Sequence, residues 1–330
     1  MIKLRFTPII AAALAVALPA SALDANRPEL KGFVAQMNAE YGLDEVWLTK
    51  LLEQAVLQPK IVEAISRPAE RVRPWYEYRD IFITDERIDA GVDYWRAHDA
   101  DLQQAAQRFA VDPDVIVAIL GVETFYGRST GRYRVLDSLT TLAFDYPPRS
   151  AFFRSELQEF VLLAREGSLD PLTVLGSYAG AMGLPQFISS SYRRFSIDSD
   201  GDGRRDLWTD NADVLASVAN YFRSHGWVRG EATIVPARVT KPEAKKLVSD
   251  HAELAHSIAE LKAAGVEFDS PLPGERRAML LALEGRDGTE YWVGFRNFYT
   301  ITRYNRSPLY ALAVHQLGAA IAERVTTDAH

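Results

Sequence analysis

Apolar side chains recur at helical spacing between residues 100 and 227, and this pattern constrains the fold more than any other feature of the sequence. Asp112-Pro113 is typical of a helix start, with the aspartate as N-cap and the proline in the first turn. Gly127 is expected to end this helix. Its apolar stripe consists of Val115, Ile116, Ile119 and Leu120. We therefore expect an amphipathic helix that packs one face into a core.

Two later segments of the same block carry similar signals. Asp170-Pro171 repeats the start signal, and Asp210 or Asn211 is expected to cap a further helix that ends at Gly226. The apolar face of that helix consists of Val214, Val218, Tyr221 and Phe222. The block as a whole predicts several helices around one core.

The regions on either side of this block differ from each other. Residues 24–100 are also predicted to be helical, except that the aromatic and basic residues 73–79 are expected to form a non-helical crossing segment. Residues 228–300 mix strands with one charged helix, and residues 308–324 return to helix. The expected strands are 232–239, 278–283 and 291–295, with a helix at 242–261 and a hairpin turn at Arg286-Asp287-Gly288. The predicted fold class is mainly α with a small α+β insertion.

The N-terminus has the features of a signal peptide. Lys3 and Arg5 precede an apolar run at 9–18 and the small-x-small sequence Ala20-Ser21-Ala22. The run is shorter than the roughly 20 residues of a membrane span, so cleavage before Leu23 is favoured over a membrane anchor. The chain has no cysteine, which excludes disulfides and leaves no site for a lipid anchor. We expect a soluble periplasmic protein.

The net charge of the chain restricts the classes of partner that it is expected to bind. The 330 residues carry a formal net charge of −7 and the sequence pI is about 5.5. Binding to a phosphate backbone requires a cationic field, so nucleic acid is not an expected partner.

Glu123 is the candidate catalytic group. It lies on the apolar face of the helix, four residues after Ile119, and in the last turn. Burial and the negative end of the helix dipole both disfavour its charged form, so its pKa is expected to be raised. A carboxyl that stays protonated near neutral pH can act as a general acid. From the residues alone, a glutamate at the edge of the core that pairs with Arg128 is an equal alternative.

Two other segments are candidates for a binding site. Residues 177–187 are rich in glycine and alanine, which permits close approach of a ligand or of a neighbouring element, and Gln186 offers both donors and an acceptor. Tight helix packing is the favoured alternative for this segment. Residues 304–310 contain Tyr304, Asn305 and Tyr310, which could stack on sugars or hydrogen-bond to them. Interface aromatics are an equal alternative there.

The acidic segment 198–213 follows the pattern of an EF-hand loop. Thr209 stands at the twelfth position, where a glutamate is usual, so Asp213 or Asp210 is the candidate for the missing carboxylate. A structural Ca²⁺ is favoured over a solvated acidic turn, and no cofactor is expected for catalysis. The other expected ligands are Asp198, Asp200, Asp202, the backbone carbonyl of Arg204, and Asp206.

Together and in this order, the motifs resemble the MltB family of lytic murein transglycosylases, the glycoside hydrolase family 103 type. The resemblance covers nearly all of the chain after the signal peptide. Leu184-Pro185 departs from the more usual pair before Gln186. The motifs are Gly-Val-Glu-Thr at 121–124, Ala-Gly-Ala-Met-Gly-x-x-Gln-Phe at 179–187, Ala-Asn-Tyr-Phe at 219–222, His-Gly-Trp at 225–227, and Arg-Tyr-Asn at 303–305 followed by Tyr310 and Ala-Leu-Ala-Val at 311–314.

The resemblance implies a lysozyme-like core flanked by a helical domain and a small mixed domain. The expected units are a signal peptide at 1–22, a helical domain at 23–100, the catalytic core at 101–228, a small α+β domain at 229–300, and a C-terminal helix at 301–330 that returns to the core. Glu123 is then the acid and base. The implied substrate-binding residues are Ser177, Met182, Gln186 and Phe187 nearest the cleaved bond, Tyr221, Tyr304, Asn305 and Tyr310 along the sugars, and Tyr78 and Arg149 as further candidates.

The implied reaction cleaves the β-1,4 bond between N-acetylmuramic acid (MurNAc) and N-acetylglucosamine (GlcNAc) in peptidoglycan glycan strands. One carboxyl suffices if the substrate's acetamido group assists, and the product is a 1,6-anhydro sugar. No convincing second carboxylate lies near the motifs, whereas ordinary glycosidases use two. A hydrolytic muramidase and a non-catalytic peptidoglycan-binding protein are the alternatives. Other cell-wall enzymes are further candidate partners.

Overall fold

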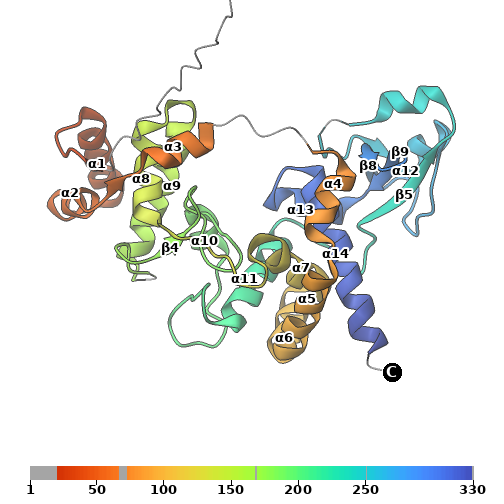
Figure 1. Cartoon of the computed structure of the whole chain (residues 1–330), viewed down its shortest axis with the longest axis horizontal. Coiled ribbons are helices and arrows are strands. Elements are labelled where there is room, and N and C mark those ends of the chain that lie inside the picture. Colours follow the sequence, from red (N-terminus) through yellow and green to blue (C-terminus); the bar gives the residue numbers. More distant parts are fainter. Residues whose placement is uncertain (1–20, 67–72, 168, 250, 329–330) are drawn as a thin grey trace, which may run out of the picture.

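The computed structural model describes residues 21–66, 73–167, 169–249 and 251–328. Helices occupy most of its long axis, and a small sheet stands at one end (Figure 1). The expected signal peptide lies outside the described residues, except for its last two residues. None of the helices in the described ranges is long and apolar enough to cross a membrane.

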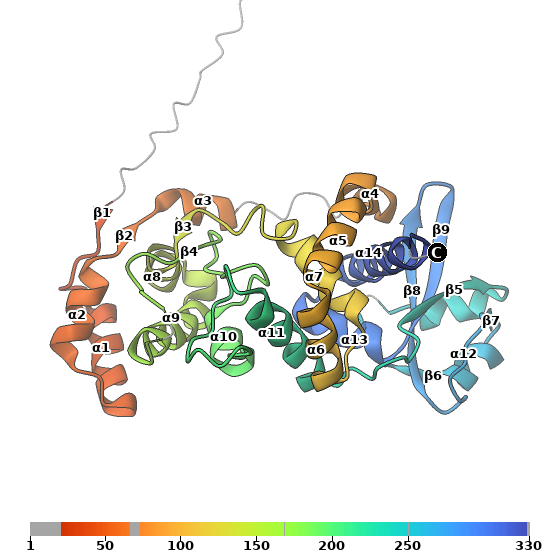
Figure 2. The ribbon, with the colours of Figure 1, turned by 90° about the horizontal axis from the view of Figure 1, so that it is seen from below.

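The end of the molecule opposite the sheet combines two segments that are far apart in the sequence. The N-terminal helices α1 (Pro28–Tyr41), α2 (Glu45–Glu53) and α3 (Pro59–Ser66) stand beside α8 (Val135–Asp145) and α9 (Ser150–Arg165) (Figures 1 and 2). Their apolar faces share one buried core, in which Phe33 meets Phe144 edge to face. The smaller elements of this part are β1 (Ser21–Ala22), β2 (Val56–Leu57), β3 (Tyr133–Arg134), η1 (Pro147–Arg149), β4 (Leu175–Gly176) and α10 (Ser189–Phe195).

A second core forms around α7 (Pro113–Thr124). This helix is buried almost all round, which is typical of the central helix of a bundle, whereas the sequence pattern predicted burial of one face. Residues 115–120 are each no more than 3% exposed. The helices of this bundle are α4 (Trp75–Phe82), α5 (Asp85–Ala97), α6 (Asp99–Phe109), α11 (Asn211–Ser224), α13 (Arg296–Tyr304) and α14 (Pro308–Thr327).

The small domain is an antiparallel sheet in the order β6-β8-β9-β5-β7. Gly285 pairs with Gly288 at the end of the central hairpin, so Arg286 and Asp287 form a two-residue turn at the expected place. Gly288 has a φ of 132°, which a side chain would disfavour. The elements are β5 (Ile234–Val239), η2 (Pro242–Leu247), β6 (His256–Ser257), α12 (Ile258–Ala263), β7 (Val266–Glu267), β8 (Arg277–Gly285) and β9 (Gly288–Gly294).

The mainly helical class, the main strands and the principal helices confirm the sequence predictions, whereas several local predictions were wrong. Residues 75–82 form α4, because the fully buried Trp75 anchors a helix in a segment of weak helical propensity. Asp170 starts a turn, since its carboxylate accepts from the amide of Leu172 and the hydroxyl of Thr173. The charged segment 242–261 is not one helix: it contains η2, the short strand β6 and the first residues of α12. Finally, α7 ends at Thr124, before Gly127.

The two helical cores cut across the domain boundaries expected from the sequence. Residues 28–66 belong to the core of α8 and α9, whereas residues 75–109 belong to the core of α7 and α14. The sharing of a core does not by itself define a domain, so the expected division at residue 100 stays a prediction.

Candidate active site

Glu123 sits in the last turn of α7, where the chain leaves the helix abruptly. Phe125 and Tyr126 follow with φ values of 52° and 57°, a left-handed conformation that costs energy for residues other than glycine. The Tyr126 hydroxyl turns back to donate to the carbonyl of Arg87 at 3.0 Å. A Cβ at Gly121 would lie 2.5 Å from that hydroxyl, so the close packing requires a glycine there. The strained turn therefore fixes the direction of the Glu123 side chain.

The environment of Glu123 favours its protonated form. Burial raises its pKa from 4.5 to about 7, and a hydrogen bond donated by the Tyr310 hydroxyl at 2.5 Å opposes part of that rise. The residue nevertheless keeps partial access to solvent. Arg128 pairs with Glu86 at 3.2 Å, so the alternative in which it neutralises Glu123 was wrong. The expectation of a raised pKa is confirmed, with burial as the main cause.

Three tyrosines from distant parts of the chain gather around this carboxyl. Tyr310 on α14 donates to it directly. Burial, together with the charge of Glu123, raises the pKa of Tyr78 on α4 and of Tyr304 at the end of α13. The Tyr304 hydroxyl donates to the carbonyl of Pro185 at 2.5 Å, which ties the site to the glycine-rich loop. All three rings were candidates from the sequence, and the fold brings them together.

The glycine-rich loop is held by hydrogen bonds within its own backbone. Met182 and Phe187 exchange amide and carbonyl bonds of 2.8 and 3.0 Å, and Gln186 lies between them with a φ of 51°. The side-chain nitrogen of Gln186 donates to the carbonyls of Thr130 and Gly183. Because both partners can only accept, the nitrogen must face them, and the side-chain oxygen is left to accept from a ligand. Ser177 and Gln186 line one pocket.

Other predicted binding residues lie behind or beside the site. Met182, Phe187 and Tyr221 are at most 7% exposed and form part of the core, and the Tyr221 hydroxyl donates to the carbonyl of Arg303. Asn305 is exposed and its side-chain oxygen accepts from the amide of Ser307. Arg149 stacks on Phe152 at 4.4 Å. Met182, Phe187 and Tyr221 therefore support the site from the buried core.

Sequence reasoning missed the role of Thr124 and most of the residues that line a pocket beside the glycine-rich loop, although Ser177 and Gln186 of that pocket were predicted. The Thr124 hydroxyl donates to the carbonyl of Leu184 at 2.9 Å and accepts from the amide of Gly127, which joins α7 to the glycine-rich loop. A pocket of about 590 Å³ also opens beside that loop. It is lined by Arg128, Ser129, Thr130, Gly131, Arg132, Tyr133, Ser177, Tyr178 and Gln186. Arg128 and Arg132, which follow the end of α7, were the available signal, but they match no spaced motif.

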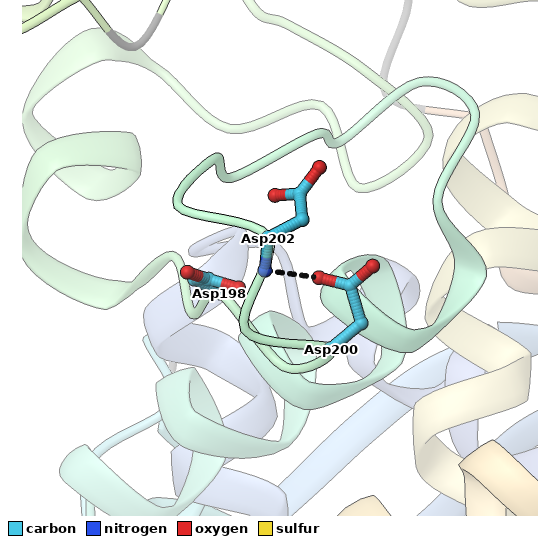
Figure 3. Close-up of side chains that lie close together, drawn as sticks. All are labelled: Asp198, Asp200 and Asp202. Carbon is cyan, nitrogen blue, oxygen red and sulfur yellow. Dashed lines mark hydrogen bonds between the residues drawn. The ribbon is translucent and has the colours of Figure 1, made fainter.

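The acidic loop brings carboxylates together as the EF-hand pattern predicts. Oxygens of Asp198, Asp200 and Asp202 lie within 4.8 Å of one another, and Figure 3 shows the three side chains around the loop. Asp200 also groups with Asp210 and Asp213, again within 4.8 Å. Oxygen donors at this spacing suit Ca²⁺, and the second group includes both candidates for the missing carboxylate.

Asp213 and Asp206 play different parts in this loop. The Asp213 carboxylate accepts from the amides of Ser199 and Asp206 at 2.6 and 2.8 Å, which ties the start of α11 to the loop. The Asp206 carboxylate is turned to the hydroxyl and amide of Thr209 and the amide of Trp208. Asp206 belongs to neither carboxylate group.

Comparison with known proteins settles the family. The model of the family described as "Transglycosylase SLT domain" matches residues 25–319. The chain belongs to this transglycosylase family. Membrane-bound lytic murein transglycosylase B of Escherichia coli (strain K12) is 41% identical over 307 residues, which cover 90% of this chain and 84% of that protein.

The solved structures that are similar to this chain support the same family assignment. Catenated lytic transglycosylase SltB1 from Pseudomonas aeruginosa has a TM-score of 0.89 and 48% identity, and the match covers 91% of this chain and 99% of that one. E. coli lytic transglycosylase Slt35 in complex with calcium has a TM-score of 0.83 and 41% identity, with 91% and 95% covered. This transglycosylase is therefore an enzyme of the lytic transglycosylase class, and the predicted family and fold class are confirmed.

Proposed function

We propose that this enzyme cleaves the β-1,4 bond between MurNAc and GlcNAc in peptidoglycan and leaves a 1,6-anhydro-MurNAc end, with Glu123 as acid and base. The observation that carries the proposal is the carboxyl of Glu123, which burial holds at a pKa of about 7 beside the Tyr310 hydroxyl. A group with that pKa can both give and take a proton at neutral pH. The name of the E. coli relative, a murein transglycosylase, supports the choice of substrate.

The reaction needs one protein carboxyl and no water. Protonated Glu123 gives its proton to the glycosidic oxygen, and the bond to C1 of MurNAc breaks. The 2-acetamido group of the substrate stabilises the positive charge that develops at C1. Glu123, now a carboxylate, removes the proton from the C6 hydroxyl, and that oxygen bonds to C1. Glu123 is protonated again at the end of the cycle.

The electrostatics of Glu123 favour a single-carboxyl mechanism over a two-carboxyl one. Ordinary glycosidases place a second carboxylate about 5–5.5 Å or 6.5–9.5 Å from the acid. A second carboxylate that close would raise the pKa of Glu123 by repulsion, yet among the described residues only burial and the Tyr310 hydrogen bond account for its shift. The substrate's own acetamido group then takes the place of a nucleophile.

A structural calcium site is part of the same proposal. Asp198, Asp200, Asp202 and Asp213, with the backbone carbonyl of Arg204, would hold a structural Ca²⁺, which the presence of calcium in the Slt35 complex supports. The ion would neutralise the crowded carboxylates and stabilise the loop before α11.

The proposed site of action is the periplasm, because the substrate is the cell wall and the N-terminus has the features of a signal peptide.

The decisive experiment is mass spectrometry of the fragments that the purified protein releases from peptidoglycan sacculi, with Glu123→Gln as the matched variant. Anhydro-ended fragments from the wild type alone are the expected result. Fragments heavier by one water would instead identify a hydrolytic muramidase, and equal release by Glu123→Gln would remove Glu123 from the mechanism. The absence of fragments from both would support a peptidoglycan-binding protein.

A further inference from the structure

The pocket beside the glycine-rich loop carries positive charge that the proposed reaction does not use. Arg128 and Arg132 both line it and both are exposed. None of the described residues that line the pocket is acidic, although the whole chain has a net charge of −7. A local cationic pocket on an acidic protein selects for an anion, because the rest of the surface repels one.

The two arginines are held by a rigid loop. Gly131 has a φ of 98°, and a Cβ there would lie 2.1 Å from the backbone of Gly176, so the two chains are in close contact. Tyr133 pairs with Gly176 between β3 and β4, and Gln186 donates to the carbonyl of Thr130 at 3.1 Å. A loop fixed in this way loses little freedom when a ligand binds.

Both guanidinium groups are available to a ligand. Arg132 has no hydrogen-bond or ion-pair partner within the described part of the chain. Arg128 lies over the ring of Phe125 at 4.4 Å and pairs with Glu86, but the two side chains of that pair are 59% and 77% exposed. Exposed ion pairs are weak, so a ligand carboxylate can displace Glu86 while the ring keeps the guanidinium in place.

We propose that this pocket binds a carboxylate of the peptidoglycan substrate through Arg128 and Arg132. The inference rests on the proposed function, since it assumes that glycan strands occupy the adjoining site. A guanidinium can hold a carboxylate by two parallel hydrogen bonds, and the pocket hydroxyls of Ser129 and Tyr178 suit the neighbouring polar groups. Two carboxylates have this chemistry: those of the peptide stem, and the lactyl carboxylate of a muramyl sugar that has lost its stem.

The test measures binding of soluble glycan strands in the Glu123→Gln background, so that the result does not depend on turnover. Calorimetric titrations use three forms of the same strands: with stems, with stems removed by an amidase, and with the freed lactyl carboxyl converted to a methylamide. The double variant Arg128→Gln/Arg132→Gln should raise Kd about tenfold for a carboxylate-bearing form, the effect of losing one charged hydrogen-bonded contact. The matched control is Arg238→Gln, an exposed arginine of the small domain that also forms an ion pair.

The three forms of the glycan strands distinguish a stem carboxylate from the lactyl carboxylate as the bound group. A loss with stem-bearing strands alone identifies a stem carboxylate, and a loss with stripped strands alone identifies the lactyl group. Partial recovery with Arg128→Lys/Arg132→Lys is expected in either case, because charge returns without the bidentate geometry. An unchanged Kd for every form, or an equal loss with the uncharged methylamide strands, overturns the proposal. Failure of the wild type to release anhydro fragments counts against the proposed function separately, since binding is read without cleavage.

Discussion

At Glu123 two opposing effects set the affinity for a proton. Burial against apolar neighbours raises the pKa, and the hydrogen bond from Tyr310 lowers it, so that the value is about 7. The neutral acid is therefore abundant at the pH where its conjugate base is also accessible, which a cycle of proton donation and removal requires. The same burial has a cost for folding, because the charged form is poorly solvated in the native state.

This cost predicts how stability depends on pH. Between pH 4.5 and about 7 the folded state keeps the Glu123 proton while the unfolded state has released it, so the free energy of unfolding falls as pH rises through that window. Glu123→Gln carries no such proton. It should be more stable than the wild type by about 2 kcal/mol at pH 8, allowing for partial exposure, and no more stable at pH 4. Urea unfolding at both pH values tests this.

The control for that comparison is Glu53→Gln, an exposed glutamate of α2. It is expected to differ little from the wild type at either pH. A gain for Glu123→Gln that is equal at pH 4 and pH 8 would show that the change acts through packing and not through the proton.

At the scale of single elements, side-chain contacts decided where helices begin and end. Pro113 starts α7 as predicted, but the Asp112 carboxylate accepts from the Trp227 ring nitrogen at 2.8 Å and from the Gly230 amide, and does not cap the helix. Asp210 does cap α11, by accepting from the amide of Asp213. Both aspartates stand at an N-cap position, and their hydrogen-bond partners distinguish them.

The acidic loop before α11 yields a prediction at this scale. Ca²⁺ at about a hundred times its Kd should stabilise the folded protein by about 2.7 kcal/mol, because the ion binds the native loop and not the unfolded chain. Asp200 belongs to both carboxylate groups, so Asp200→Asn should abolish most of this gain. Thermal unfolding with Ca²⁺ and with a chelator measures it.

Asp287→Asn is the matched control, since Asp287 is exposed in the hairpin turn of the small domain. It should leave the calcium response intact. The same unfolding temperature with Ca²⁺ and with chelator in the wild type would argue that the loop is a solvated turn.

At the scale of the whole molecule, the candidate active site lies where the two helical cores meet. Tyr304 packs against both cores, and Glu123 stands at the end of the helix that is central to one of them. The small sheet is joined to this arrangement through α13, whose fully buried Asn297 holds the chain that leaves α11. Its side chain bonds the amide and carbonyl of Val228 and the carbonyl of Glu231, at 2.8–3.0 Å.

Removing the Asn297 side chain should loosen this junction. Asn297→Ala leaves three backbone groups without their partner, so the free energy of unfolding should fall by about 3 kcal/mol. Asn38→Ala, which removes one bond to the carbonyl of Leu43 at the end of α1, should cost about 1 kcal/mol and serves as the comparison. Equal small losses in denaturant unfolding would mean that water replaces the Asn297 contacts.

The sequence by itself determined the helical class, the helix that starts at Pro113, the hairpin at Arg286-Asp287 and Glu123 as the candidate acid. These features depend on local patterns: helical periodicity, helix-start residues and turn residues act over a few neighbouring positions. The acidic loop could be predicted from the sequence for the same reason, since most of its oxygen donors lie within nine consecutive residues.

Only the tertiary structure decided which of these helices and loops pack into the same core. The helical conformation of residues 75–82 and the turn at Asp170 depend on what each segment packs against or hydrogen-bonds, and a local pattern carries no such information. The meeting of Tyr78, Tyr304 and Tyr310 at Glu123 likewise joins positions up to 232 residues apart, 310 minus 78. Burial, and with it the raised pKa on which the proposed role of Glu123 depends, is a property of that assembly and not of any one segment.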